Sequence, residues 1–177
     1  MTDKQRALKA KGYSLWLMPS GGAYNKLAAL IKTLVEKYRS PLFEPHITLL
    51  GEIVLTEEDV IRRSQQLASG QKPFSTTLQT VDYQDFYFRA LFVKAEKTKP
   101  LLALHNRAKK IFEMQETPSY IPHLSLLYGN FANPVKDQII RDIGKKQKME
   151  FRVGAIHLFK TDGEVKVWHE VKEFPLG

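Results

Sequence analysis

The chain contains one pattern twice: Pro45-His-Ile-Thr-Leu-Leu50 and, 77 residues later, Pro122-His-Leu-Ser-Leu-Leu127. The apolar residues of each copy predict a buried strand. Because residues i and i+2 of a strand face the same side, His46 shares a face with Thr48, and His123 with Ser125. The aliphatic residues between them face the other way. Each copy is therefore expected to present a polar pair on one side and to pack against helices on the other.

The surrounding segments predict a similar order of elements in both halves of the chain. The strands are expected at Tyr13–Met18, His46–Leu50, Phe74–Val81, Phe86–Lys94 and His123–Tyr128, followed by a hairpin of Phe151–Phe159 and Val165–Val171 around Asp162-Gly163. The helices are expected at Tyr24–Tyr38, from the N-cap Thr56 to about Ala68, from Pro100 through Phe112, and from the N-cap Asn133 with Pro134 at its first position. The two histidines occupy matching points. A pseudo-twofold arrangement of the halves would bring both polar faces to one cleft.

The composition limits the class of protein. With 177 residues, 43% hydrophobic and 26% charged, the chain is expected to form one domain, 1–177. It has no cysteine, which excludes disulfides, thiolate catalysis and cysteine-based metal sites. No apolar run approaches the ~20 residues of a membrane span, and the start of the chain does not resemble a signal peptide. We therefore expect a cytosolic protein without membrane contact. The net charge of +8 favours anionic partners.

Two histidines and two hydroxyls in one cleft suit the hydrolysis of a phosphodiester. One imidazole can take a proton from water while the other protonates the leaving oxygen, since both titrate near neutral pH. The hydroxyls can donate hydrogen bonds to the non-bridging oxygens. Neither copy offers carboxylates or a third histidine at ligand spacing, so no metal and no other cofactor is predicted.

A single His-x-Thr strand is common and seldom catalytic. The repetition of the preceding proline and the following leucines is what favours a functional interpretation of His46 and His123. The other three histidines lack this context. We interpret His105 as a polar helix residue, and His157 and His169 as structural or surface residues of the last hairpin.

The paired motifs resemble those of the two-histidine phosphoesterase superfamily. Within it, the chain is most similar to the plant and yeast cyclic phosphodiesterases that act on ADP-ribose 1″,2″-cyclic phosphate. The similarity covers nearly the full chain, and it is most specific in the segment Pro118–Tyr128. It is carried by Tyr13-Ser-Leu-Trp16, Phe43-Glu-Pro-His-Ile-Thr48, the aromatic strand Phe86-Tyr-Phe88, and Pro118-Ser-Tyr-Ile-Pro-His-Leu-Ser-Leu-Leu-Tyr128.

This resemblance implies a bilobal α+β fold, with two antiparallel sheets, flanking helices and a central cleft. It implies metal-independent hydrolysis of nucleoside 2′,3′-cyclic phosphates to 2′-phosphates and of ADP-ribose 1″,2″-cyclic phosphate to ADP-ribose 1″-phosphate. The catalytic motif positions of the family correspond to His46, Thr48, His123 and Ser125. Its aromatic substrate-binding positions correspond to Trp16, Phe88 and Tyr128, although the residues alone are equally compatible with core packing for Trp16 and Phe88.

The resemblance also implies that His123 activates water and that His46 is the acid, which the equivalent halves alone leave open. The plant enzymes have cysteines, so any redox control known there is not expected in this chain.

Two other functions remain open from the sequence. The positive charge is compatible with an RNA-end phosphodiesterase or a 2′,5′ ligase-like enzyme, but the basic residues are scattered and do not suggest a continuous basic channel. The second alternative is a nucleotide-binding module without catalysis, for which two matched imidazoles are not needed. A small cyclic phosphate nucleotide remains the favoured partner, RNA ends are possible partners, and the chain is expected to be monomeric.

Overall fold

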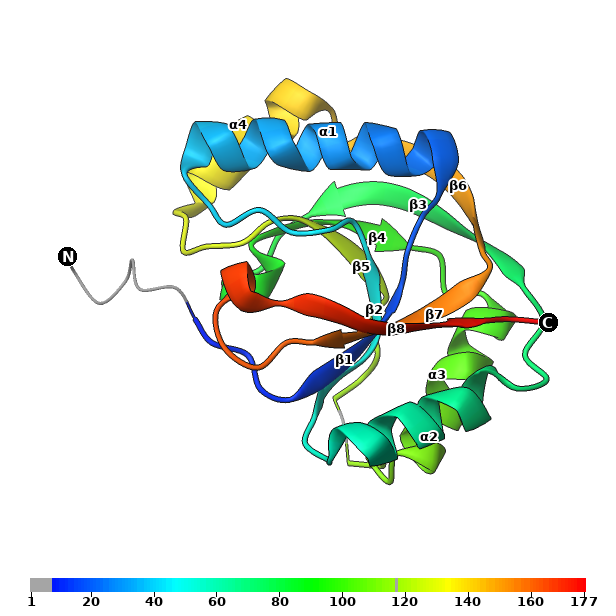
Figure 1. Cartoon of the computed structure of the whole chain (residues 1–177). Coiled ribbons are helices and arrows are strands. Elements are labelled where there is room, and N and C mark those ends of the chain that lie inside the picture. Colours follow the sequence, from blue (N-terminus) through cyan, green and yellow to red (C-terminus); the bar gives the residue numbers. More distant parts are fainter. Residues whose placement is uncertain (1–7, 117) are drawn as a thin grey trace.

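A computed structural model describes residues 8–116 and 118–177. Within them, eight strands form one antiparallel sheet in the order β6-β3-β4-β5-β2-β1-β7-β8 (Figure 1). The strands are β1 (Tyr13–Leu17), β2 (Ile47–Ile53), β3 (Phe74–Asp82), β4 (Leu91–Ala95), β5 (His123–Leu127), β6 (Lys146–Val153), β7 (Ala155–Lys160) and β8 (His169–Pro175). The expectations about the start of the chain fall on residues 1–7, which lie outside the described residues.

Four α-helices cover the sheet in two pairs. They are α1 (Gly21–Tyr38), α2 (Glu57–Ala68), α3 (Lys99–Ile111) and α4 (Asn133–Ile143). Two short 3-10 helices, η2 (Tyr87–Arg89) and η3 (Val165–Val167), precede β4 and β8. In Figure 1, α1 and α4 lie together on one side of the molecule and α2 and α3 on the other. The Thr56 side chain accepts a hydrogen bond from the Asp59 amide at the start of α2, as its predicted cap requires.

The sheet consists of two four-stranded lobes. The first lobe contains β2, β1, β7 and β8, and the second contains β6, β3, β4 and β5. Between them, β2 and β5 pair at a single register position, Ile47 with Leu124. The predicted α+β class with antiparallel strands is confirmed. The two predicted sheets are joined at this position into one, because the two histidine strands lie next to each other and share a backbone bridge.

The lobes do not coincide with the two halves of the sequence. Strand β3 ends the first half but pairs with β4 and β6 in the second lobe. Strand β7 belongs to the second half but pairs with β1 in the first lobe. Two helices are exchanged between the lobes as well. Helix α1 of the first half packs on β5 of the second lobe, and α3 of the second half packs on β2 of the first lobe. Each lobe is therefore built from both halves of the chain.

Four of the sequence-based element predictions are wrong in detail. The stretch Val165–Val171 is not one strand, because η3 occupies Val165–Val167 and β8 begins only at His169. The stretch Phe86–Lys94 is not one strand, because η2 interrupts it and β4 begins only at Leu91. The stretch Phe151–Phe159 contains the end of β6 and the start of β7, separated by Gly154, and β6 pairs with β3 rather than with the last hairpin. Asn133 is the first residue of α4, and Ala132 takes the cap position.

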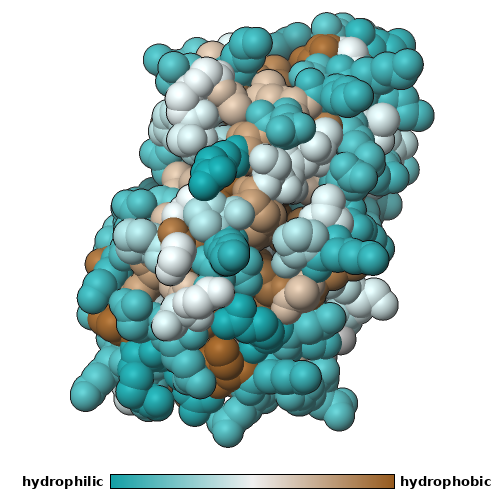
Figure 2. Space-filling model, turned by 90° about the vertical axis from the view of Figure 1, so that its right-hand side faces the viewer, coloured by the Kyte–Doolittle hydropathy of each residue, from teal (hydrophilic) through white to brown (hydrophobic). Residues whose placement is uncertain are grey.

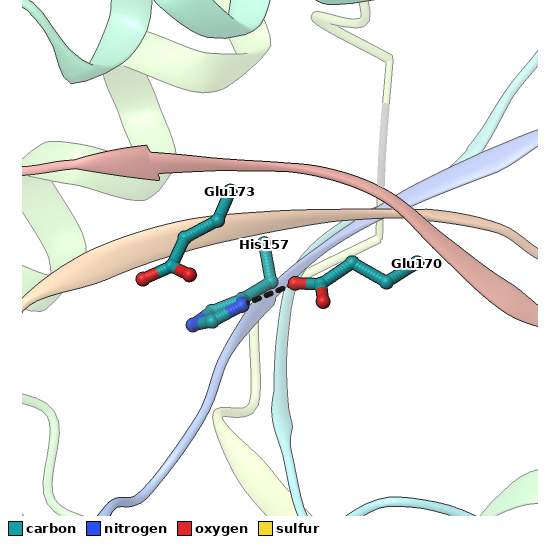
Figure 3. Close-up of side chains that lie close together, drawn as sticks. All are labelled: His157, Glu170 and Glu173. Carbon is teal, nitrogen blue, oxygen red and sulfur yellow. Dashed lines mark hydrogen bonds and ion pairs between the residues drawn. The ribbon is translucent and has the colours of Figure 1, made fainter.

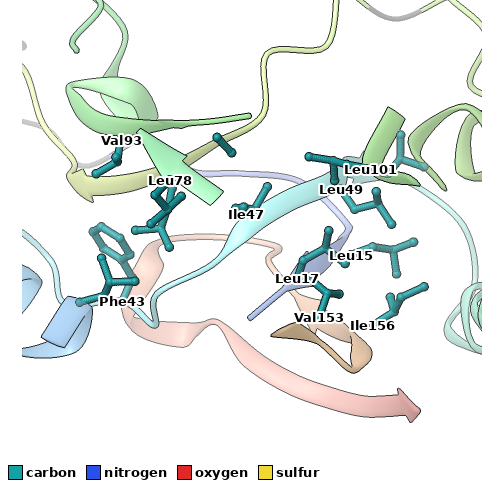
Figure 4. Close-up of a cluster of buried hydrophobic side chains, with 14 of the residues drawn as sticks. Leu15, Leu17, Phe43, Ile47, Leu49, Leu78, Val93, Leu101, Val153 and Ile156 are labelled. Atoms are coloured by element: carbon teal, nitrogen blue, oxygen red, sulfur yellow. The ribbon is translucent and has the colours of Figure 1, made fainter. Parts of the chain in front are cut away.

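The hydrophobic core fills the space between the sheet and the helices. The alternation seen in the two histidine strands is borne out, because Ile47, Leu49, Leu124 and Leu126 are all at most 1% exposed. Figure 4 shows Ile47 and Leu49 of β2 among core residues contributed by several elements, such as Leu78, Leu101 and Ile156. Full burial of each such side chain contributes about 1.5–3 kcal/mol. The opposite faces of β2 and β5 are thereby directed away from the helices.

The surface is mainly polar on the side seen in Figure 2, where hydrophobic residues form small, separate patches. Over residues 8–116 and 118–177, the helices are too short or too polar for any of them to cross a bilayer.

Candidate active site

One cavity of about 320 Å³ lies between the lobes and is lined by the polar faces of the two histidine strands. All seven predicted site residues border it: Trp16, His46, Thr48, Phe88, His123, Ser125 and Tyr128. Its volume is at the lower end of the range of small-molecule sites. The structure thus brings together side chains that are far apart in the sequence.

His46 immediately precedes β2 and is 5% exposed. Its Nδ1 atom is 2.6 Å from the carbonyl oxygen of Glu44, so Nδ1 carries the proton and donates it there. The other ring nitrogen, Nε2, keeps its lone pair for the cavity. Burial lowers the pKa of His46 to about 3, although the bond to Glu44 opposes this change. In the free protein His46 is therefore neutral at pH 7.

His123, the first residue of β5, repeats this arrangement. Its Nδ1 atom donates to the carbonyl of Ile121 at 2.7 Å, two residues earlier, as His46 does to Glu44. Burial lowers the pKa of His123, and the positive charge of Arg89 lowers it further. Both imidazoles are consequently fixed in the same tautomer, with Nε2 as the free nitrogen of each.

The two hydroxyl groups differ in their surroundings. Ser125 is 5% exposed, and its Oγ donates a hydrogen bond to the carbonyl of Phe88 at 2.9 Å. Among the residues that the structure describes, the Thr48 hydroxyl has no hydrogen-bond partner. Thr48 can therefore donate to a ligand without breaking a protein contact, whereas Ser125 must first turn away from Phe88.

The aromatic residues form a connected wall. Trp16 stacks on His46 with 3.5 Å between ring centroids, and Phe88 meets Tyr128 edge to face at 5.3 Å. Trp168, which follows η3, contacts Trp16, Phe88 and Tyr128 at centroid distances of 6.1, 5.8 and 6.1 Å. Sequence reasoning missed Trp168. Its position in the last hairpin gave no indication that the hairpin lies beside Trp16.

Two charged residues of the cavity wall were also missed. Arg89 comes from η2 and Glu52 from the end of β2. Glu52 has a φ of 54°, in the left-handed region that residues other than glycine seldom adopt, and the pairing of β1 with β2 is irregular nearby. Irregular strand ends of this kind redirect side chains. The run Phe86-Tyr-Phe-Arg89, with a base beside three aromatics, was the signal that could have identified Arg89.

Tyr120 connects the two histidine strands where the lobes join. It lies three residues before His123, and its hydroxyl donates to the carbonyl of Thr48 at 2.9 Å. The ring of Tyr120 stacks on His105 of α3 with 3.8 Å between centroids. The Nδ1 atom of His105 is 2.8 Å from the carbonyl of Leu49 and donates to it. His105 and Tyr120 therefore donate hydrogen bonds to the carbonyls of Leu49 and Thr48, respectively. These are consecutive residues of β2, and they follow Ile47, which forms the single bridge to β5.

His157 and His169 do not line the cavity. His157 lies on β7 close to Glu170 and Glu173 of β8 (Figure 3). Its Nδ1 atom is 2.6 Å from Glu170 Oε1, and the ligand-type atoms of all three lie within 4.8 Å of one another. Among the described residues this is the one group of three that has the spacing of a metal site. It shares no residue with the cavity, although His157 is the cross-strand partner of Trp16, which borders it.

A cavity between two lobes, with a His-x-Thr/Ser strand from each, defines a two-histidine phosphoesterase. The chain belongs to the 2′-5′ RNA ligase superfamily, whose family model matches residues 15–164. The resemblance inferred from the sequence is thereby confirmed.

Named relatives agree with this assignment. The chain is 26% identical to the cyclic phosphodiesterase of Arabidopsis thaliana over 163 residues, which cover 90% of each chain. It is 33% identical to the 2′,3′-cyclic-nucleotide 3′-phosphodiesterase of Phaeosphaeria nodorum over 135 residues, which cover 66% of this chain and 68% of the relative.

Solved structures show the same fold. A protein of Thermus thermophilus has a TM-score of 0.64 at 20% identity, covering 93% of this chain and 97% of that one. LigT of E. coli, crystallised with 3′-AMP, has a TM-score of 0.64 at 16% identity, covering 95% of this chain and 99% of that one.

Proposed function

We propose that the chain hydrolyses small cyclic phosphodiesters by an acid–base mechanism that uses His46 and His123 and needs no metal. The proposed substrates are nucleoside 2′,3′-cyclic phosphates, which give nucleoside 2′-phosphates, and ADP-ribose 1″,2″-cyclic phosphate, which gives ADP-ribose 1″-phosphate. The names of the Arabidopsis and Phaeosphaeria relatives support this substrate class. A cytosolic, monomeric enzyme is part of the proposal.

The observation that carries the proposal is the matched setting of the two imidazoles. Each donates Nδ1–H to a carbonyl two residues earlier, at 2.6 Å for His46 and 2.7 Å for His123. Each therefore leaves Nε2 free beside the same cavity. An in-line displacement at phosphorus needs one proton acceptor on the side of attack and one proton donor on the side of departure. Two preoriented imidazoles from opposite lobes can fill these two roles.

In the proposed reaction, Nε2 of His123 takes a proton from water as its oxygen bonds to phosphorus. The bond from phosphorus to the 3′ oxygen breaks, and that oxygen takes a proton from Nε2 of His46. Thr48 and, after rotation, Ser125 donate hydrogen bonds to the non-bridging oxygens, whose negative charge must be stabilised in the transition state. The phosphate remains on the 2′ oxygen. Exchange with solvent then returns both imidazoles to their starting protonation.

The low pKa of His46 is compatible with its role as the acid. Burial disfavours a lone charge, but the same low-dielectric surroundings strengthen the attraction between an imidazolium and a phosphate anion. Binding of the anion therefore raises the pKa of His46 from its value of about 3 in the free protein. Once protonated, an imidazole with a low intrinsic pKa is also a strong acid toward the departing oxygen. We infer that His46 receives its proton together with the substrate.

The charge distribution favours a small substrate over a long RNA. Of the described residues that border the cavity, only Arg89 and Glu52 carry formal charges at pH 7. The net charge of +8 is therefore not concentrated at the site, as a channel that follows an RNA backbone would need. An RNA-end phosphodiesterase or a 2′,5′ ligase-like enzyme is the second candidate, favoured by the total charge alone.

The proposed function is tested by activity on a panel of substrates. The panel contains the four nucleoside 2′,3′-cyclic phosphates, ADP-ribose 1″,2″-cyclic phosphate and an RNA oligomer that ends in a cyclic phosphate. We expect turnover of the small substrates, with the phosphate retained on the 2′ oxygen, or on the 1″ oxygen of ADP-ribose. Preference for the RNA would favour the second candidate. Binding of all panel members without turnover would indicate a non-catalytic nucleotide-binding module.

A further inference from the structure

Arg89 borders the cavity and has no ion-pair partner among residues 8–116 and 118–177. It is the one lysine or arginine among the described residues that border it. Among these residues its guanidinium has no carboxylate partner; it lies over the ring of Phe86, 4.9 Å from the centroid. The nearest acid in the sequence on its N-terminal side, Asp85, instead pairs with Lys136 at 2.7 Å. All hydrogen-bond donors of the Arg89 fork are therefore available to a ligand.

The backbone that carries Arg89 is held on several sides. The Arg89 amide donates to the carbonyl of Phe86 at 2.9 Å, and its own carbonyl accepts from the Gln84 amide at 3.1 Å. The neighbouring carbonyl of Tyr87 accepts from the Gly129 amide at 2.9 Å, and that of Phe88 from Ser125. The short helix η2 is thus attached to the histidine strand β5. A ligand on Arg89 would be held in a fixed relation to His123.

Arg89 belongs to the mouth of the cavity. Phe86, over which its guanidinium lies, is 47% exposed, whereas His46 and Ser125 are each 5% exposed. The positive charge still acts on His123, whose pKa it helps to lower. The guanidinium is therefore close to the reacting groups but nearer to solvent than they are. With a cyclic phosphate between the histidines, Arg89 faces the part of the substrate that extends outward.

We propose that Arg89 is a second phosphate site, which binds a phosphate on carbon 5 of the same ribose that carries the cyclic phosphate. The proposal rests on the proposed function, because that function places the cyclic phosphate between the histidines. An arginine fork matches two oxygens of a phosphate. A 5′-phosphate, the pyrophosphate of an ADP-ribose derivative and the last phosphodiester of an RNA all share this chemistry. Arg89 thus selects cyclic phosphates that carry a second phosphate over simple cyclic nucleosides.

A matched pair of substrates tests this directly. Adenosine 2′,3′-cyclic phosphate and 5′-phosphoadenosine 2′,3′-cyclic phosphate differ only in the second phosphate. Steady-state kcat/KM is measured for both with the wild type, Arg89→Gln, Arg89→Lys and the control Arg62→Gln, which removes the same charge from an exposed position on α2. We expect Arg89→Gln to lower kcat/KM for the 5′-phosphorylated substrate by about 10–100-fold, since a hydrogen bond to a charged group is being lost. The substrate without the second phosphate should lose less, so that the ratio of the two kcat/KM values falls by about tenfold or more.

The outcomes separate the roles that Arg89 could have. Arg89→Lys, which keeps the charge without the fork, should lie between wild type and Arg89→Gln, and Arg62→Gln should match wild type. An equal loss with both substrates would mean that Arg89 acts at the reacting phosphate or on the fold, and would overturn the proposal. No loss with either would overturn it as well.

A binding measurement covers the case in which the wild type hydrolyses neither substrate. Adenosine 2′,5′-bisphosphate and 2′-AMP form an equivalent pair of ligands that need no turnover. If Arg89→Gln weakens binding of the bisphosphate alone, by about 10-fold or more, Arg89 is the second phosphate site even though the proposed hydrolysis has failed. Equal affinities of wild type and variant for the bisphosphate would contradict the site itself. The two proposals therefore fail in distinguishable ways.

Discussion

The indole of Trp16 lies parallel to the imidazole of His46, with 3.5 Å between the ring centroids and 5° between the planes. On the second lobe, Phe92 pairs with Ser125 as Trp16 pairs with Thr48, but its ring is 5.0 Å from that of His123 and inclined by 58°. The two histidines are therefore equivalent in the backbone but different in their surroundings. Trp16 covers one face of His46 and excludes water from it, which disfavours the charged form of the ring.

Replacement of either histidine is expected to remove most of the activity. His46→Ala and His123→Ala should each lower kcat by roughly 10²–10⁴-fold, the contribution of a general acid or base. Turnover of adenosine 2′,3′-cyclic phosphate measures this, and urea unfolding shows whether the fold is intact. His169→Ala, which alters an exposed histidine outside the cavity, is the control. Near-normal turnover by either variant would contradict the proposed acid–base mechanism.

The stability of the fold should depend on pH through His46. Its pKa is about 3 in the folded protein and 6.5 when unperturbed. Between these values the unfolded chain binds a proton that the folded chain does not, so the free energy of unfolding decreases as the pH falls from 6.5 toward 3. At most, one such group contributes about 1.4 kcal/mol per pH unit.

His46→Gln, which cannot titrate, should show a shallower decline than wild type between pH 6 and 4. Urea unfolding at several pH values gives both curves. His169→Gln should follow the wild type. Parallel curves for wild type and His46→Gln would show that His46 titrates normally in the folded protein.

The roles of the histidines can be separated with a substrate whose leaving group departs without a proton. If His46 is the acid, a phosphodiester with a nitrophenolate leaving group should be hydrolysed by His46→Ala at a rate within about tenfold of wild type. The same substrate should not rescue His123→Ala, because attack by water still needs a base. Release of nitrophenolate follows the reaction by absorbance. Rescue of His123→Ala instead of His46→Ala would exchange the two roles.

Tyr120 is expected to stabilise the junction of the lobes. Tyr120→Phe keeps the stacking on His105 but removes the hydrogen bond to the carbonyl of Thr48. The loss of this partly buried hydrogen bond should lower the free energy of unfolding by about 0.5–1.5 kcal/mol. Because Thr48 is held less firmly, kcat should also fall, by a few fold. The control is Tyr38→Phe, a half-buried tyrosine outside the cavity whose hydroxyl has no hydrogen-bond partner among the described residues. An unchanged unfolding curve would contradict this role.

Removal of divalent ions should leave the activity unchanged. The cavity wall provides two histidines and one carboxylate, that of Glu52, and the proposed mechanism assigns both histidines to proton transfer. The group formed by His157, Glu170 and Glu173 lies outside the cavity. After prolonged dialysis against a chelator, kcat on a 2′,3′-cyclic nucleotide should equal that of untreated protein. Loss of activity that a divalent ion restores would count decisively against a metal-free reaction.

The local pattern of the chain was sufficient to predict both histidine strands and their polar faces. Alternation and the flanking prolines placed His46 with Thr48 and His123 with Ser125, and all four border one cavity. Cap chemistry located the start of α2, because Thr56 has the side chain that a helix N-terminus needs. Such signals depend on residues a few positions apart, and the sequence contains them directly.

Features that depend on strand exchange could not be predicted in this way. Gly154 alone separates β6 from β7, yet the two strands lie at opposite sides of the sheet. No periodicity indicates that β7 returns to β1, so the approach of Trp168 to Trp16 was not foreseen. Arg89 was missed for a related reason. The run that precedes it alternates like a strand, but its backbone turns into η2 and aims the guanidinium at the cavity mouth.

The exchange of β3 and β7 between the lobes limits how such a protein can have arisen. If the two halves descend from one duplicated unit, a single copy of that unit could not have closed either lobe. Two copies would have completed each other by swapping a strand and a helix, as an intertwined homodimer does. Its cleft would have lain on the symmetry axis, with the same histidine contributed twice. Fusion into one chain would then have allowed the two positions to diverge, as the difference between Trp16 beside His46 and Phe92 beside His123 illustrates.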